Sequence, residues 1–202
     1  MAHGMTRTVA TMSLVLAASP AFAHVGVGDI SHFSSGFFHP LLGLDHVLAM
    51  VAVGLYASQL GRRNVWLVPF AFVSTMIVGG LLGYNGVPLP HVEQGIGASV
   101  VIMGVAIAAG LELPTVAAMG LVASFALFHG HAHGNEGVGA GMLFLPYAAG
   151  FIVATTALHC VGICIGLGLK KLGGWQAELL QRAVGAIGAL TGVALLAGWV
   201  SA

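Results

Sequence analysis

Charged side chains are scarce in this sequence, with six Lys or Arg and six Asp or Glu among 202 residues, which is 6% of the chain. Soluble domains carry about 25% charged residues. Hydrophobic residues instead make up 58% of the chain, and the mean hydropathy is +0.99. So little charge among several long apolar runs predicts an all-α, polytopic membrane protein embedded in a lipid bilayer.

Three other classes of protein are excluded by what is missing. The formal net charge is zero, so there is no basic surface for nucleic acid. The two cysteines, Cys160 and Cys164, lie inside one apolar run, which argues against a disulfide framework. No Gly-x-x-x-x-Gly-Lys-[Ser/Thr] phosphate loop is present, so nucleotide hydrolysis by that route is excluded. Histidine, by contrast, is abundant: ten residues against six Lys or Arg.

The first 23 residues are predicted to be a cleavable signal peptide. Arg7 gives a positive start, 9–18 form an apolar core, and Ala21-Phe22-Ala23 fits the small-x-small cleavage pattern. The core has about 10 residues where a span needs about 20, although an uncleaved first anchor is the alternative. Cleavage would leave His24 at the new N-terminus, outside the cytoplasm, where its amine and imidazole together could chelate a divalent metal.

The remainder, residues 24–202, is predicted to be one transmembrane domain with six helices. Residues 24–38, which include His32, are expected to form a short exposed lead-in. Pro40 suits the first position of a helix, so His39 is the expected N-cap. The predicted spans cover about 40–60, 65–84, 91–110, 113–133, 142–169 and 176–200, each near the roughly 20 residues that a crossing needs.

The basic residues predict the orientation. If the mature N-terminus lies outside, Arg62, Arg63, Lys170, Lys171 and Arg182 all fall on the cytoplasmic side, as the positive-inside rule requires. We therefore expect a bacterial inner-membrane protein with both ends of the mature chain in the periplasm.

Glycine is frequent, with 31 residues, and three pairs have the spacing that lets helices approach closely: Gly79 and Gly83, Gly162 and Gly166, and Gly188 and Gly192. Packing within the bundle is the favoured interpretation of these pairs. A homo-oligomer face is the alternative.

The first group of candidate ligands is His39, Asp45 and His46. At about 100° per residue, His39 and His46 would lie within about 20° of each other on one helix face. Asp45 points elsewhere, either to a metal shared with a neighbouring helix or to a ligating imidazole that it orients. An ionised Asp near the bilayer centre costs roughly 2.5–3.5 kcal/mol, so a functional reason is expected. The alternative for His39 alone is a capping residue.

The second group lies in Phe128–Glu136, at the outer end of the fourth predicted helix. If this segment is helical, His129, His133 and Glu136 form one stripe and His131 points elsewhere. If it is extended, the three imidazoles share a face instead. A solvated loop that happens to be rich in histidine is the alternative.

Two further places carry candidate residues. His91 and Glu93 open the third predicted helix, where Glu93 would also complement the positive helix end. His159 lies deep in the fifth, beside cysteines that we interpret as packing residues rather than soft ligands. Imidazoles and carboxylates that are graded from the outside inwards indicate a route for a cation. These ligands suit borderline divalent ions such as Ni²⁺, Co²⁺, Cu²⁺ or Zn²⁺.

The segment His39–Met50, HPLLGLDHVLAM, resembles the first-helix signature of the HupE/UreJ family of nickel permeases, which accompany hydrogenase and urease genes. The segment Phe128–Glu136, FHGHAHGNE, resembles the second signature of that family. The resemblance implies that the substrate is nickel. It also implies metal-handling roles for the following residues: His39, Asp45 and His46 in the first helix, and His129, His133 and Glu136 at the fourth. The role of His131 stays open.

The sequence hypothesis is therefore a permease, not an enzyme, that imports Ni²⁺ and carries no organic cofactor. His24, His32 and the fourth-helix group would capture the ion, Asp45 and His46 would hold it, and His159 would receive it on the way in. One alternative is an accessory protein that delivers nickel to hydrogenase or urease assembly without transporting it. The other is a membrane metallohydrolase with a metal-bound water at the outer cluster.

Overall fold

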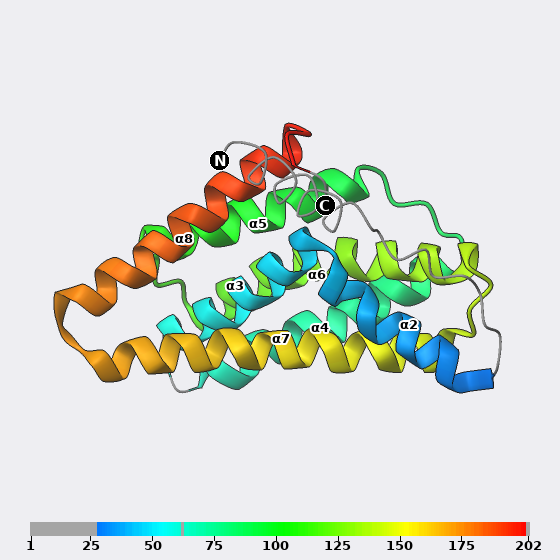
Figure 1. The fold of residues 1–202 in the computed structure, drawn as a ribbon, viewed down its shortest axis with the longest axis horizontal. Helices are drawn as coiled ribbons and strands as arrows, with labels where there is room; N and C mark the ends of the chain where they lie inside the picture. The colour runs from blue at the N-terminus through cyan, green and yellow to red at the C-terminus, as the bar shows by residue number, and fades with distance from the viewer. Residues whose placement is uncertain (1–27, 62, 201–202) are drawn as a thin grey trace, which may run out of the picture.

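The computed structural model describes residues 28–61 and 63–200, and within them the fold is all-α with no strand (Figure 1). The predicted signal peptide, residues 1–23, and His24 lie outside the described residues. The helices are α2 (Gly28–Leu42), α3 (Leu44–Leu60), α4 (Asn64–Tyr84), α5 (Val92–Ala108), α6 (Thr115–Gly139), α7 (Phe144–Leu172) and α8 (Gly174–Leu196).

The last five helices begin within two residues of their predicted starts, because local proline and glycine signals mark where one helix stops and the next begins. Pro114 directly precedes α6 and has non-helical backbone angles, φ −54° and ψ 144°. Gly110, Gly141 and Gly173 have positive φ angles at the connections that follow α5, α6 and α7. Glycine adopts this left-handed conformation without the steric cost of a Cβ atom, so the helices stop there.

The first predicted span is two helices rather than one. α2 begins at Gly28, so much of the expected exposed lead-in is helical, and it packs along α7. The chain breaks at Gly43, which has extended backbone angles, and the two parts are bent by 80°. The prediction that His39 caps a helix start is wrong, because His39 lies in the last turn of α2 with Pro40 inside the same helix.

Four helices are long and apolar enough to cross a membrane, judged by length and composition: α4, α6, α7 and α8. The bent pair, Ser31–Leu42 with Leu44–Leu60, makes a fifth if it counts as one broken span. α5 is also apolar but has only 17 residues, about 25 Å of helix. The protein is thus a helical membrane protein, and the sixth crossing stays a prediction.

Glycines bring the helices into close contact in pairs. A Cβ atom on Gly54 of α3 would overlap the backbone of His159, and one on Gly162 of α7 would overlap the backbone of Val51. Gly79 and Gly83 of α4 lie against the backbone of α6 in the same way. The packing interpretation of these spacings is confirmed for α3 with α7 and for α4 with α6. Gly188 differs, since a Cβ there would meet nothing.

The helices form an inner group and a flanking pair. α5 and α8 lie side by side along one edge of the molecule, and α7 runs along the opposite edge with α2 against it (Figure 1). The buried core is made of apolar side chains from α3 to α7, including Tyr56, Phe72, Met103 and Phe151. Large apolar side chains such as Trp66 and Leu190 are exposed on the outside, as expected for a surface that faces lipid.

Candidate metal centre

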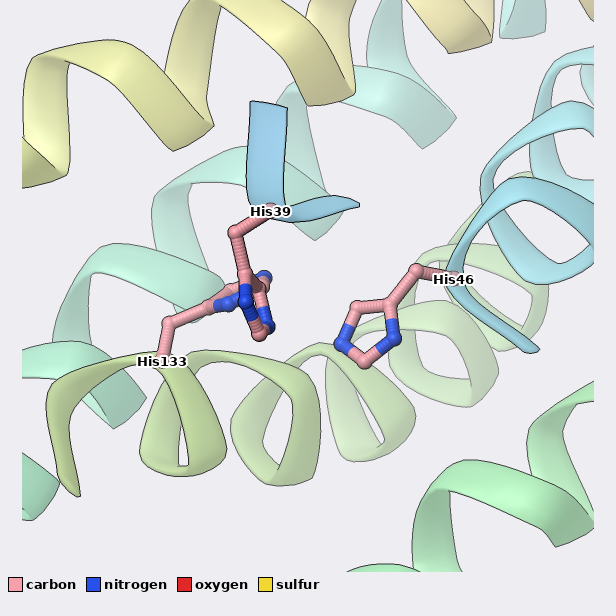
Figure 2. A group of neighbouring side chains, drawn as sticks. All are labelled: His39, His46 and His133. Carbon is pink, nitrogen blue, oxygen red and sulfur yellow. The ribbon is translucent and has the colours of Figure 1, made fainter. Parts of the chain in front are cut away.

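Three imidazoles from three helices converge next to the break between α2 and α3. His39, His46 and His133 each offer one nitrogen, and these nitrogens all lie within 4.8 Å of one another. Figure 2 shows the three side chains reaching from α2, α3 and α6 toward the same space. Imidazole nitrogens bind borderline divalent metals at about 2.1 Å, so two on one ion lie at most about 4.2 Å apart. A movement of less than about an ångström would therefore bring the three nitrogens onto one ion.

The break at Gly43 creates this convergence. It ends α2 just beyond His39 and starts α3 just before His46, so two imidazoles that are close in sequence approach from different directions. A Cβ on Gly43 would lie 2.9 Å from Asp45 Oδ1 and 3.1 Å from His46 Nδ1. Glycine thus leaves space beside the ligands, whereas its backbone angles, φ −83° and ψ 120°, are open to any residue. The common face of a continuous helix, which the sequence predicted, is not what joins these histidines.

Asp45 orients His46 and is itself buried. Its Oδ1 lies 2.7 Å from His46 Nδ1 and also accepts the backbone N–H of His46 at 2.7 Å. The carboxylate has no hydrogen, so Nδ1 of His46 donates, and the lone pair stays on Nε2. Nε2 is buried without a hydrogen-bond partner in the described part of the chain. This contact has the geometry of the orienting role, and the choice between the two roles predicted for Asp45 stays a prediction.

His133 is held by packing. Its ring is fully buried and stacks on Phe151 with centroids 4.8 Å apart and an interplanar angle of 17°. Neither nitrogen finds a hydrogen-bond partner among the described residues. An unpaired buried polar atom costs roughly 1–3 kcal/mol, and a bound cation would remove that cost.

The other two histidines of the histidine-rich segment, His129 and His131, point in different directions. α6 is helical throughout it, so the helical alternative is right and the extended one is wrong. His129 lies one turn before His133, with its ring centroid 4.9 Å from that of His46 and its Nε2 2.9 Å from Ser99 Oγ. His131 points away and bonds the carbonyl of Val87 at 2.7 Å, between α4 and α5, which gives it a structural contact.

Carboxylates line the open side of the cluster. Glu136 Oε2 lies 2.7 Å from His39 Nε2, and both side chains are partly exposed. A cavity of about 300 Å³ is lined by Glu136, Glu93 and Asp45 together with His39 and His46. Three carboxylates at the mouth of a site with neutral imidazoles favour a cation over an anion. Glu136, which the sequence predicted to share a stripe with His129 and His133, thus meets the first group at this cavity.

His159 is a separate, deeper imidazole. It is 1% exposed, and both of its nitrogens lack hydrogen-bond partners in the described residues. Its ring contacts Phe72 edge-on with centroids 5.1 Å apart, and Phe72 also contacts His129 at 5.8 Å. Cys160 and Cys164 are exposed on the outside of the bundle, so they do not add soft ligands.

The two remaining candidates have other contacts. His32 accepts the backbone N–H of Leu143 on Nδ1 at 3.3 Å and lies 3.0 Å from the sulfur of Met142, so it ties α2 to the α6–α7 connection. His91 adopts a left-handed conformation, with φ of 59°, at the start of α5.

Sequence reasoning missed Ser99, Phe72 and Phe151. No local pattern marks them, because their importance comes from which helix packs beside them.

Comparison with known proteins supplies the family. The model of the HupE / UreJ protein family matches residues 12–195. Protein HupE of Rhizobium leguminosarum bv. viciae is 43% identical over 196 residues, which cover 93% of this chain and 97% of that protein. No solved structure matches the chain.

Proposed function

This chain belongs to the HupE/UreJ family, and from that premise we propose that it is an inner-membrane permease that imports Ni²⁺. The observation that carries the proposal is the convergence of His39, His46 and His133 between membrane helices, with their nitrogens within 4.8 Å. Histidine buried among apolar helices is costly unless a ligand uses it. The nickel assignment rests on the resemblance of the two signatures to those of nickel permeases, and Co²⁺ is the nearest alternative by ligand preference.

The ion would enter through the cavity that Glu93 and Glu136 line. These carboxylates raise the local concentration of cations and take up part of the charge as water is lost. Glu136 is paired with His39, so the ion would replace that contact when it binds His39 Nε2. The N-terminal histidines, His24 and His32, are proposed to capture the ion first.

At the cluster, three neutral imidazoles would hold the ion. Asp45 would not touch the ion but would stabilise it through its hydrogen bond to the far side of the His46 ring. The carboxylate keeps His46 in the tautomer whose Nε2 faces the ligand. It also places a negative charge beside a divalent cation in a medium of low dielectric. This arrangement explains why an acid is buried here at only 5% exposure.

From the cluster the ion would pass His129 and then His159, with the ring of Phe72 against both. Several moderate sites conduct better than one tight site, because an ion must also leave. The membrane potential supplies roughly 2.3 kcal/mol per charge per 100 mV, which is one source of drive for a divalent ion. Residues 24–202 would act as one domain of six crossings, with α5 as the short one and both ends in the periplasm.

Uptake of radioactive nickel into proteoliposomes tests this proposal. Purified protein is expected to carry nickel inward when a potential, negative inside, is imposed, and His46→Ala is expected to abolish that uptake. His91→Asn is the matched control, since it removes an imidazole outside the cluster and asparagine tolerates the left-handed backbone. Nickel binding without uptake would replace the permease with an accessory protein that hands the metal on.

A further inference from the structure

Ser99 of α5 is a buried hydroxyl that contacts His129 of α6. Its Oγ lies 2.6 Å from the carbonyl oxygen of Ile96 and 2.9 Å from His129 Nε2. Two oxygens this close share a hydrogen, so the single hydroxyl hydrogen of Ser99 is donated to Ile96. Toward His129 the hydroxyl can then only accept. Nε2 of His129 therefore carries the proton.

This assignment leaves a free lone pair on the other nitrogen of His129. A neutral imidazole has one N–H, so Nδ1 is the unprotonated atom. Nδ1 is buried and has no hydrogen-bond partner among the residues that the structure describes. Buried acceptors are normally satisfied, so an unpartnered one next to a candidate metal site points to a missing ligand.

His46 and His129 are neighbours with opposite tautomers. Their ring centroids are 4.9 Å apart at nearly a right angle. Asp45 accepts the Nδ1 proton of His46 and frees Nε2, while Ser99 accepts the Nε2 proton of His129 and frees Nδ1. Each imidazole has one anchored nitrogen and one free one. His129 is not in the group of three nitrogens that converge within 4.8 Å, but its ring lies against His46, which is in that group.

We propose that Ser99 is a positioning residue that fixes His129 with its proton on Nε2, so that Nδ1 takes the divalent cation from the three-histidine cluster. His129 would thus be the first inward donor after the cluster. This inference rests on the proposed import function for its direction, whereas the tautomer itself does not depend on transport.

Two substitutions at Ser99 distinguish the effect of losing the hydroxyl from the effect of changing the side-chain volume. Ser99→Ala removes the acceptor for His129 and frees both tautomers, whereas Ser99→Thr retains a hydroxyl at the same atom. Ser58→Ala is the matched control, because Ser58 is also fully buried and also bonds the carbonyl three residues earlier, at 2.7 Å, without touching a histidine. Thermal unfolding of each variant in detergent shows whether it folds.

Nitrogen-15 NMR of histidine-labelled, metal-free protein in lipid bilayers measures the tautomer directly, with the His129 signals identified by their loss in His129→Gln. We expect a protonated Nε2 and an unprotonated Nδ1 in the wild type and in Ser99→Thr, and a mixture of both tautomers in Ser99→Ala. A wild-type His129 with its proton on Nδ1 would overturn the inference whether or not the protein transports nickel.

Transport provides the second measurement. Nickel uptake by Ser99→Ala should fall roughly 10-fold, the scale of effects seen when the partner of a metal-binding histidine is removed. Equilibrium nickel binding to the cluster should persist, and Ser58→Ala should transport like the wild type. If Ser99→Ala takes up nickel as fast as an active wild type, the role of His129 as the first inward donor would be overturned, but its positioning by Ser99 would not. An inactive wild type that still shows the expected tautomer would overturn the import function and leave the positioning of His129 by Ser99 supported.

Discussion

At the scale of single residues, Asp45 is a carboxylate whose burial is energetically unfavourable and whose hydrogen bond to His46 gives a reason for that burial. Asp45→Asn keeps an oxygen that can accept the proton of His46 but removes the charge beside the ion. We expect nickel affinity to fall by roughly 10- to 100-fold, as it does when other orienting partners of metal ligands are changed. Calorimetric titration of the purified protein with nickel measures this. Equal affinity in Asp45→Asn and in the control His91→Asn would show that the carboxylate has no role in binding.

The imidazoles also predict a pH dependence. Only neutral imidazole binds a metal, and its ordinary pKa is about 6.5, so protonation competes with the ion as the pH falls. Uptake should therefore be highest near neutral pH and should decline as the solution becomes acidic, at a constant imposed potential. Initial rates in proteoliposomes across this range provide the measurement. Equal rates at about pH 5 and about pH 7.5 would argue against coordination by histidine.

Individual site residues differed in how far the sequence could predict them. Asp45, His46 and His133 stand out because ionisable side chains inside apolar runs are rare and therefore informative. Ser99 and Phe72 do not stand out, since serine and phenylalanine are ordinary in such helices. Their contacts with His129 depend on how α4 and α5 pack against α6, which no local pattern encodes.

At the scale of helices, the break at Gly43 is the feature that matters most. The sequence predicted one continuous span from Pro40, because proline suits a helix start and the residues before it carry Asp29 and His32 among glycines and serines. The structure instead extends a helix back to Gly28 and docks it on α7, where Gly36 and Gly150 let the two backbones meet. That docking is a long-range contact. The starts of α4 to α8, which depend on local proline, glycine and hydropathy signals, were predicted closely.

Close contacts between helices predict which glycines cannot be replaced. Gly54→Ala would place a Cβ into the backbone of α7 at His159, which has no flexible end that could move aside. Overpacking of this kind costs typically 1–3 kcal/mol, so the thermal midpoint should fall. Gly168→Ala is the control, because a Cβ there meets nothing and alanine favours a helix over glycine by about 1 kcal/mol. Thermal unfolding should rank Gly168→Ala at or above the wild type and Gly54→Ala below it; the reverse order would contradict the packing.

At the scale of the whole molecule, the histidine cluster and the basic residues lie toward different ends of the helices. Lys170, near the end of α7, donates to the carbonyl of Ser58 at 2.6 Å, near the end of α3, whereas His46 begins α3. If the basic end lies in the cytoplasm, as proposed, the carboxylate-lined cavity would open toward the periplasm. The proposed orientation would then give the ion an entrance on the outer side, and it depends on the complete bundle.

Cysteine labelling from one side of the membrane tests the orientation. In a background with Cys160→Ser and Cys164→Ser, Ala140→Cys, in the α6–α7 connection, should react with a membrane-impermeant thiol reagent added outside intact spheroplasts. Lys171→Cys should react only after the membrane is opened. Labelling of the Lys171 position from outside would invert the topology and place the cavity on the cytoplasmic side.

The central claim is that His39, His46 and His133 hold the same ion, and X-ray absorption of the nickel-loaded protein measures this most directly. The wild type should show scattering from three imidazoles around nickel. His39→Ala, His46→Ala and His133→Ala should each lose one imidazole or fail to bind the metal, while His91→Asn should match the wild type. A nickel spectrum that stays the same when any one of the three is replaced would contradict the site.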